Sequence, residues 1–308
     1  MKAIVIEQYG PAEQLSISQI TAPKPKAGQV RIQVKAASVN PVDTMVRAGM
    51  LESFISLPLI AGWDVSGVVL ETAGDSHGVQ VGDEVMAMIP IGQPGAYAEQ
   101  VIVDSALVVK KPHNLSFEQA AGTPMVSLTA WQAIHDIGNV SCGQTVLIHG
   151  GSSAVGAFAI QFAKLAGARV IATASATNHP YLRELGADQC IDYRSGQFEA
   201  MVSNVDLVFA AIGEEGLLER SLKVIKSGGK LVSTLSEIDP EIAQASGITF
   251  QRVWVTPDHD KLAHIANLLS DGRLSLKIDS VFPLEQAAQA HQRSESRRAV
   301  GKVILTMA

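Results

Sequence analysis

A run of small residues, 151–156 (Gly-Ser-Ser-Ala-Val-Gly), follows an apolar stretch at 146–149 and leads into an alanine-rich helical pattern. In a dinucleotide-binding turn, the first glycine permits a tight bend, the second lets the backbone approach the diphosphate, and the third lets helix and strand pack closely. Gly151 and Gly156 fill the first and third places, whereas Ser153 holds the second. Free N–H groups and the helix dipole favour phosphate at such a helix N-terminus.

The motif predicts that residues Gly151, Ser152, Ser153, Ala154, Val155 and Gly156 bind a diphosphate. The Cβ of Ser153 would push the phosphate outward, and the hydroxyls of Ser152 and Ser153 could donate hydrogen bonds to it in return. The alternative is that small residues at this position serve only the packing of strand against helix.

A second strand-like stretch, 169–174, follows the helix and ends before Ser175. An NAD site requires an acidic residue there for the ribose hydroxyls, whereas an NADP site excludes the carboxylate and offers donors or cations to the 2′-phosphate. Ser175 and Asn178 stand at this place, and Asp192-Tyr193-Arg194 follow later in the chain. These residues favour NADP(H). The alternative is that they are ordinary surface-turn residues.

Composition excludes several classes of protein. The chain has 308 residues, a formal net charge of −6 and a pI near 5.8, so it offers no basic field for nucleic acid or an anionic membrane. No apolar run reaches the roughly 18 residues that span a bilayer, and a soluble cytoplasmic protein is expected. The two cysteines, Cys142 and Cys190, form no CxxC pair, which argues against a tetrathiolate zinc lobe and a disulfide framework.

The pattern along the chain predicts two domains. The first third contains short Val/Ile-rich runs between Gly and Pro, such as Gln29 to Asn40, which indicates antiparallel strands. From about Leu115 the spacing becomes helical, with Ser116 as N-cap and Gly138 as the stop. Alternating strands and helices then predict a doubly wound parallel sheet, with a helix at 217–225 and an edge strand at 248–255.

After Pro257 the sequence predicts a helix at 260–269, a strand in "LKIDSVFPL", a helix at 285–291 and a final strand in "GKVILTM". These segments are similar in character to the opening strands, so we expect the chain to return to the first domain. The predicted domains are therefore 1–117 with 256–308, and 118–255.

Several stretches together carry a family resemblance: "ASVNPVDTMVRAG", "PLIAGWDVSGVV", "VGDEV", "GAYAEQVIVD", "HGGSSAVG", "LGADQCIDYR" and "GKVIL". Through them the chain resembles the medium-chain dehydrogenase/reductase superfamily, in its zinc-independent, quinone oxidoreductase-like branch. The resemblance implies an α/β fold with a GroES-like antiparallel β catalytic domain and a Rossmann-type domain. Asn40, Trp63 and Met125 stand where zinc members of the family have metal ligands, so no metal site is expected.

The resemblance also implies an enzyme that transfers hydride from NADPH to a quinone or an α,β-unsaturated carbonyl, a small apolar electrophile. Asn40 is the implied catalytic residue. The cofactor-binding residues implied outside the turn are Asn40, Thr129, Ser175, Asn178, Tyr193, Ile212, Gly213 and Leu235. A homodimer joined through the edge strand at 248–255 is expected on the same ground.

Two other functions stay open at this point: a non-catalytic NADPH-binding sensor or scaffold, and an NADPH-dependent reductase of acyl thioesters.

Five further residues have structural interpretations. Asp43 and Arg47, four positions apart, could form a local ion pair. Tyr97 and His149 are interpreted as structural residues rather than proton donors. Lys302 is interpreted as an ordinary charged residue before the last strand, and the alternative that the resemblance implies is a place near the cofactor.

Overall fold

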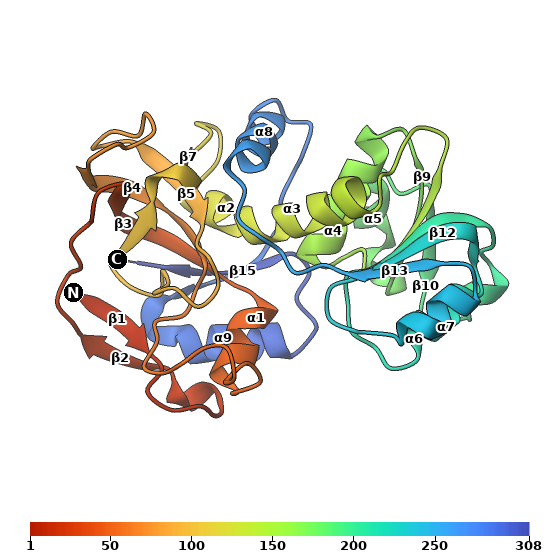
Figure 1. The fold of residues 1–308 in the computed structure, drawn as a ribbon, viewed down its shortest axis with the longest axis horizontal. Coiled ribbons are helices and arrows are strands. Elements are labelled where there is room, and N and C mark those ends of the chain that lie inside the picture. The colour runs from red at the N-terminus through yellow and green to blue at the C-terminus, as the bar shows by residue number, and fades with distance from the viewer. Residues whose placement is uncertain (308) are drawn as a thin grey trace. The chain divides into compact units, whose positions relative to one another are not determined.

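The computed structural model describes residues 1–307, and its chain divides into two compact units (Figure 1). Unit 1 contains Met1–Met125 and Pro257–Ala308, and unit 2 contains Val126–Thr256. Among the described residues, every helix is too short or too polar to cross a lipid bilayer. The assignment of separate catalytic and dinucleotide-binding roles to two domains stays a prediction.

Unit 1 is built on a seven-stranded sheet in the order β14-β15-β3-β4-β5-β7, with β6 paired to β3. Val30, Ile32 and Val34 of β3 are buried, as their alternation predicts. The C-terminal strands join this sheet, as expected, but β14 runs parallel to β15 and the rest is antiparallel. A separate antiparallel pair, β1 and β2, completes the strands.

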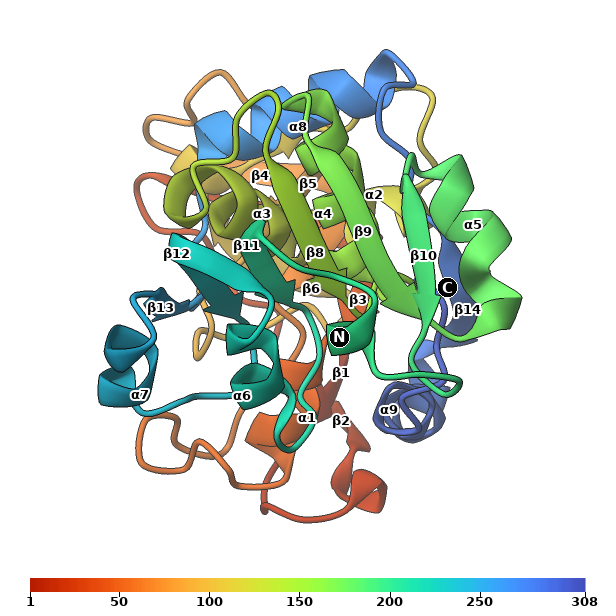
Figure 2. The same cartoon turned by 90° about the vertical axis from the view of Figure 1, so that its right-hand side faces the viewer.

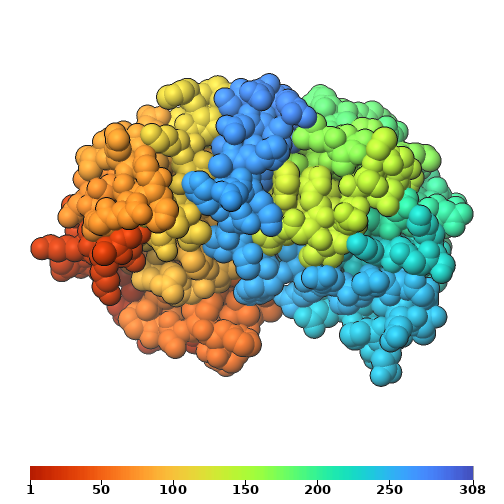
Figure 3. All heavy atoms as spheres, turned by 45° about the horizontal axis from the view of Figure 1, so that its top comes forward, coloured from red at the N-terminus to blue at the C-terminus, as the bar shows by residue number. Residues whose placement is uncertain are grey.

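The strands of unit 1 are β1 (Lys2–Val5), β2 (Ser16–Gln19), β3 (Gln29–Val39), β4 (Asp64–Ala73), β5 (Glu84–Met88), β6 (Gln100–Asp104), β7 (Val109–Lys110), β14 (Ile278–Pro283) and β15 (Lys302–Thr306). Its α-helices are α1 (Pro41–Arg47), α2 (Phe117–Gly122), α8 (His259–Ser270) and α9 (Ala287–Glu295). Short 3₁₀ turns lie at η1 (Ala12–Gln14), η2 (Ser105–Leu107) and η6 (Leu284–Gln286). Helix α8 forms part of the surface and is blue in Figure 3.

The helical stretch that starts at Ser116 is divided into three pieces, where the sequence predicted one helix. Ser116 caps α2 as predicted, because its hydroxyl accepts from the Gln119 N–H and the Gln119 side chain accepts from the Ser116 N–H. The chain then breaks before Pro124, which has no N–H for a helical hydrogen bond. Helix α3 (Pro124–Trp131) follows, and a π-helical turn, η3 (Gln132–Ile137), ends at Gly138.

Unit 2 contains a fully parallel six-stranded sheet in the order β10-β9-β8-β11-β12-β13 (Figure 2). Numbered from β8, the order is 3-2-1-4-5-6, which is the Rossmann arrangement. The last four residues of β8 are all buried, so both faces of the sheet are covered. Helix α4 packs on β8 and β9, and α5, α6 and α7 pack on β10, β12 and β13.

The strands of unit 2 are β8 (Thr145–His149), β9 (Arg169–Ala174), β10 (Gln189–Asp192), β11 (Val205–Ala210), β12 (Ile225–Ser233) and β13 (Thr249–Arg252). Its helices are α4 (Ala154–Leu165), α5 (His179–Glu184), α6 (Leu217–Leu222) and α7 (Pro240–Ala245), with 3₁₀ turns at η4 (Ala176–Asn178) and η5 (Phe198–Ala200). The helix predicted at 217–225 ends at Leu222 instead, because Ile225 already pairs with Val205 of β11. Strand β13 lies at the sheet edge, as predicted.

Candidate active site

Most of the predicted cofactor-binding residues lie at the carboxyl ends of the parallel strands in unit 2. The small-residue turn follows β8, Ser175 and Asn178 follow β9, and Tyr193 follows β10. The remaining members at this edge are Ile212 and Gly213 after β11 and Leu235 after β12. Ligands of doubly wound sheets bind at this edge, next to the point where the strand order reverses.

The tight bend after β8 falls at Gly150, one residue earlier than the sequence predicted. Gly150 has a φ of +76°, in the left-handed region that favours glycine, whereas Gly151 does not. A Cβ on Gly150 would lie 2.4 Å from Cγ2 of Ile212. Gly156 is equally constrained, since a Cβ there would lie 2.2 Å from the Gly150 carbonyl oxygen. These two glycines let the helix start directly against the turn.

Ser153 is the N-cap of α4. Its Oγ accepts a hydrogen bond from the Gly156 N–H at 3.1 Å, and its hydroxyl donates to the Gly150 carbonyl at 2.8 Å. The hydroxyl is therefore used within the turn, and its donation to a phosphate stays a prediction that would require it to leave the Gly150 carbonyl.

The end of β9 carries no carboxylate, because the chain continues Ser175, Ala176, Thr177, Asn178. The Asn178 amide donates to the Ser175 hydroxyl at 3.2 Å. The pairing of Asp192 with Ala174 places Tyr193 and Arg194 beside this strand end. The Tyr193 side chain is 54% exposed, and the Arg194 guanidinium lies 5.4 Å from its ring centre. This corner thus holds hydroxyl, amide and cationic groups.

Two predicted residues lie elsewhere. Thr129 is a buried residue of α3, and Asn40 belongs to unit 1. His149, which precedes the turn, is buried and hydrogen-bonded with Thr173 and Ser221. Burial, with a smaller effect of Arg220, lowers the pKa of His149 to about 3. The imidazole is therefore neutral near pH 7, as a structural role requires.

In unit 1, Asn40 lies between a buried cation and a buried anion. Its Oδ1 accepts from the Lys302 ammonium, and its Nδ2 donates to Asp64 Oδ2 at 2.9 Å. Asn40, Asp64 and Lys302 are 2%, 0% and 3% exposed. The interpretation of Lys302 as an ordinary charged residue is wrong. The sequence signal that could have found it is a lysine directly next to an apolar strand.

Asp64 begins β4 and accepts three hydrogen bonds in addition to the Lys302 interaction. The Met125 N–H donates to Oδ1 at 2.8 Å, and the Ser38 hydroxyl and Asn40 amide donate to Oδ2. Lys302 Nζ lies 3.7 Å from Oδ2. A fully buried carboxylate is stable only with such compensation, so this cluster fixes the start of α1 against β4 and β15.

The predicted ion pair between Asp43 and Arg47 does not form. Asp43 instead accepts from the Asn40 N–H and the Tyr97 hydroxyl, while Arg47 pairs with Glu295 of α9. The reason is that Asp43 caps the start of α1 and is buried against Tyr97, whereas Arg47 is held by Glu295 from a distant segment. His291 links them, with Nε2 3.2 Å from the Tyr97 oxygen and Nδ1 3.4 Å from Arg47 Nη1.

Two of the ionisable groups in this hydrogen-bonded network, Asp43 and His291, have pKa values shifted in opposite directions. Burial raises the pKa of Asp43 to about 7, opposed by its hydrogen bond from the Asn40 N–H and by Lys302. Burial lowers the pKa of His291 to about 3, with a smaller effect of Arg47. Within residues 1–307, Asp43 Oδ1 has no hydrogen-bond partner. The carboxyl is thus able to carry a proton near neutral pH.

Family comparisons match both parts of the chain. Residues 26–113 match the alcohol dehydrogenase GroES-like domain, and residues 185–305 match the zinc-binding dehydrogenase family. The chain is 35% identical to the chloroplastic NADPH-dependent alkenal/one oxidoreductase of Arabidopsis thaliana, an alignment that covers 99% of this chain and 79% of the relative.

Solved structures agree with this relationship. The quinone oxidoreductase of Coxiella burnetii superposes with a TM-score of 0.92 at 34% identity, covering 100% of this chain and 99% of the other. A structure titled NAD-dependent alcohol dehydrogenase also gives a TM-score of 0.92, at 30% identity and full coverage of both chains.

Proposed function

Because this chain belongs to the medium-chain dehydrogenase/reductase superfamily and is an oxidoreductase related to quinone and alkenal/one reductases, we propose that it is an NADPH-dependent reductase of quinones or α,β-unsaturated carbonyls. The observation that carries the proposal is the turn after β8, where Gly150 has a left-handed φ and a Cβ on Gly156 would lie 2.2 Å from the Gly150 carbonyl oxygen, so that α4 begins directly after the strand. A helix that starts this close to the strand end directs its first N–H groups and its dipole at the position of a diphosphate.

The corner at the end of β9 supports NADP(H) over NAD. A 2′-phosphate needs donors and positive charge, and Ser175, Asn178 and Arg194 supply them, while the nearby Asp192 carboxylate accepts from the Arg194 backbone N–H at 3.0 Å. The related alkenal/one oxidoreductase is named as NADPH-dependent. One structural relative is titled NAD-dependent, so direct competition between the two nucleotides is the appropriate test.

Bound NADPH would supply the hydride, which adds to the electron-poor carbon of the conjugated acceptor. The turn at 150–156 would hold the diphosphate, and Ile212, Gly213 and Leu235 would border the nicotinamide end. Asn40 would donate from Nδ2 to the acceptor oxygen, where negative charge develops in the transition state. Thr129 would contact the cofactor ribose.

We also propose a homodimer in which β13 pairs with its copy across a twofold axis. Strand β13 occupies the edge of the six-stranded sheet, and an edge strand presents unpaired backbone groups. The cytoplasmic location expected from the sequence likewise stays a prediction.

The acceptor is identified by NADPH oxidation with a panel of quinones, enones and α,β-unsaturated acyl thioesters. Turnover of quinones or enones above acyl thioesters supports the proposal, and their ratio separates quinone from enone chemistry. NADPH binding without turnover of any acceptor would contradict it and favour a sensor or scaffold. Preference for acyl thioesters would assign the chain to that different class of substrate.

A further inference from the structure

We propose that Lys302 is a positioning residue for Asn40, because its buried ammonium fixes the direction of the Asn40 carboxamide and so determines which donor Asn40 presents. The inference deepens the proposed function and rests on it, since it is Asn40 that would meet the acceptor oxygen. Lys302 would act through Asn40.

The Lys302 ammonium contacts Asn40 although the two residues are 262 positions apart in the sequence. In the antiparallel pairing of β15 with β3, Val303 lies opposite Val39, so Lys302 lies at the level of Asn40. Its Nζ donates to Asn40 Oδ1 and, at 3.1 Å, to the Val39 carbonyl. The aliphatic part packs beside Gly122 of α2, where a Cβ would lie 3.1 Å from Lys302 Cγ.

The opposite end of the carboxamide faces Asp64. Nδ2 donates to Asp64 Oδ2 at 2.9 Å, and the carboxylate is held in place by the Ser38 hydroxyl and the Met125 N–H. A rotated amide would point its NH₂ group at the ammonium and its oxygen at the carboxylate, and both contacts are repulsive. The two charges therefore allow one orientation only.

This orientation has a chemical consequence for Asn40. Nδ2 carries two hydrogens, and one of them is taken by Asp64. The second donates to Ser38 Oγ at 3.4 Å, a long hydrogen bond that an acceptor oxygen would have to replace. The fixed amide thus directs both N–H groups toward oxygen acceptors, and the cation at its carbonyl oxygen polarises them.

Charge balance explains why a lysine is stable at this depth. Burial lowers the pKa of Lys302, and the carboxyl groups of Asp64 and Asp43 oppose that shift. Removal of Lys302 would leave Asp64 without a cation and Asn40 Oδ1 without a donor. The carboxamide would then be free to turn its NH₂ group away from the acceptor.

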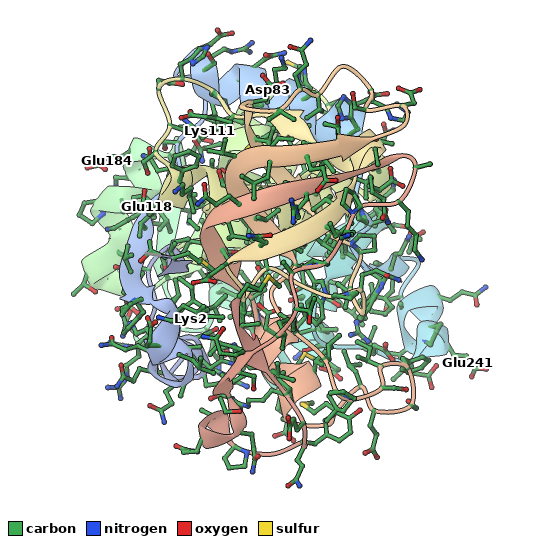
Figure 4. The ribbon with its side chains drawn as sticks, turned by 90° about the vertical axis from the view of Figure 1, so that its left-hand side faces the viewer. Lys2, Asp83, Lys111, Glu118, Glu184 and Glu241 are labelled. Atoms are coloured by element: carbon green, nitrogen blue, oxygen red, sulfur yellow. The ribbon has the colours of Figure 1, made fainter. Side chains whose placement is uncertain are left out.

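The direct test is the solvent exchange of the Asn40 side-chain amide, measured by nuclear magnetic resonance on protein with isotope-labelled asparagine. The signal is identified by its loss in Asn40→Ala. In Lys302→Met we expect its exchange to accelerate by about tenfold or more. Lys111→Met is the matched control, because Lys111, labelled in Figure 4, is also a buried lysine of unit 1. It pairs with Glu84. An unchanged Asn40 signal in Lys302→Met would overturn the proposal.

A second pair of variants covers the case in which Lys302→Met does not fold. Lys302→Met combined with Asp64→Asn removes both buried charges and is compared with Asp64→Asn alone. The double variant should exchange the Asn40 amide faster than the single variant, which keeps the Lys302 contact. Equal exchange in the two would overturn the proposal.

Kinetics tests whether the positioning matters for reduction. Lys302→Met should lower kcat by about tenfold to a hundredfold at unchanged KM for NADPH, and it should cause no further loss in an Asn40→Ala background. Additive losses, or an unchanged kcat, would contradict the inference. If the wild type reduces no acceptor, the proposed function fails, while the amide exchange still decides whether Lys302 orients Asn40.

Discussion

The Ser153 hydroxyl donates to the Gly150 carbonyl at 2.8 Å and accepts from the Gly156 N–H at 3.1 Å. The serine thus closes the turn ahead of α4 on itself, and one of the N–H groups at the start of the helix is occupied by a protein partner. A ligand phosphate at this helix N-terminus would compete with that contact.

Two substitutions separate the effect of the Ser153 hydroxyl from the effect of its Cβ. Ser153→Ala removes the cap and should lower the free energy of unfolding by about 1 kcal/mol, whereas Ser153→Gly should cost only a few tenths. Ser153→Gly also removes the Cβ and frees the Gly156 N–H, so it should bind NADPH about threefold to tenfold more tightly. Fluorescence titration measures this, and equal affinity in all three proteins would contradict it.

The close approach of Gly156 to Gly150 predicts a severe effect of one methyl group. Gly156→Ala would place its Cβ 2.2 Å from a backbone oxygen. The turn must open, and we expect a loss of about 1 to 3 kcal/mol in unfolding free energy and of about tenfold or more in NADPH affinity.

Gly196→Ala is the control for this substitution, because its Cβ would meet only Met201 Sδ, at 3.8 Å. A Gly156→Ala protein with wild-type stability and NADPH affinity would show that the turn does not require a glycine at position 156.

Much of the fold could be predicted from the sequence, because it depends on local signals. Buried strand runs, the Ser116 capping box and the alternation of strands with helices each lie within a few residues of one another. The sequence pattern predicts the tight bend at Gly151, one residue after its actual position at Gly150, because the adjacent glycines give the same local pattern.

The polar cluster of unit 1 could not be predicted in the same way. Lys302 meets Asn40 only through the register of β15 on β3, and Arg47 meets Glu295 only through the packing of α1 on α9. Such contacts depend on tertiary structure, which local spacing does not reveal. The four-residue spacing of Asp43 and Arg47 predicts an ion pair between them, and that pair does not form.

The buried carboxyl of Asp43 predicts that part of the protein's stability is lost as the pH rises toward neutrality. Its folded pKa of about 7 exceeds its ordinary value of 3.8, so the folded chain binds more protons than the unfolded chain between about pH 4 and pH 7. The contribution of Asp43 to the free energy of unfolding, measured as the difference between the wild type and Asp43→Asn, should therefore fall as pH rises through this window, by about 1 to 3 kcal/mol.

Denaturant unfolding between about pH 5 and pH 8.5 measures the effect, with the exposed Asp271→Asn as control. Loss of the same amount of stability in Asp43→Asn as in the wild type would show that Asp43 is ionised throughout. His149 and His291 act in the opposite direction. Because their folded pKa values are near 3, they destabilise the folded chain as pH falls below about 6.5.

The edge position of β13 predicts a dimer. Light scattering at micromolar concentration should give twice the chain mass of 32.6 kDa. A single species of monomer mass would exclude the proposed pairing of β13 with its copy, which would join two six-stranded sheets into one.

The most direct test of the whole account is a fluorescence titration of the wild type and Ser175→Asp with NADPH and NADH. The wild type should bind NADPH more tightly than NADH, since Ser175 leaves room and donors for the 2′-phosphate. Ser175→Asp should weaken NADPH binding by about tenfold or more, through repulsion and lost donors, and favour NADH. Binding of neither nucleotide by the wild type, or no effect of Ser175→Asp on NADPH affinity, would contradict the placement of an NADPH site at the carboxyl ends of these strands.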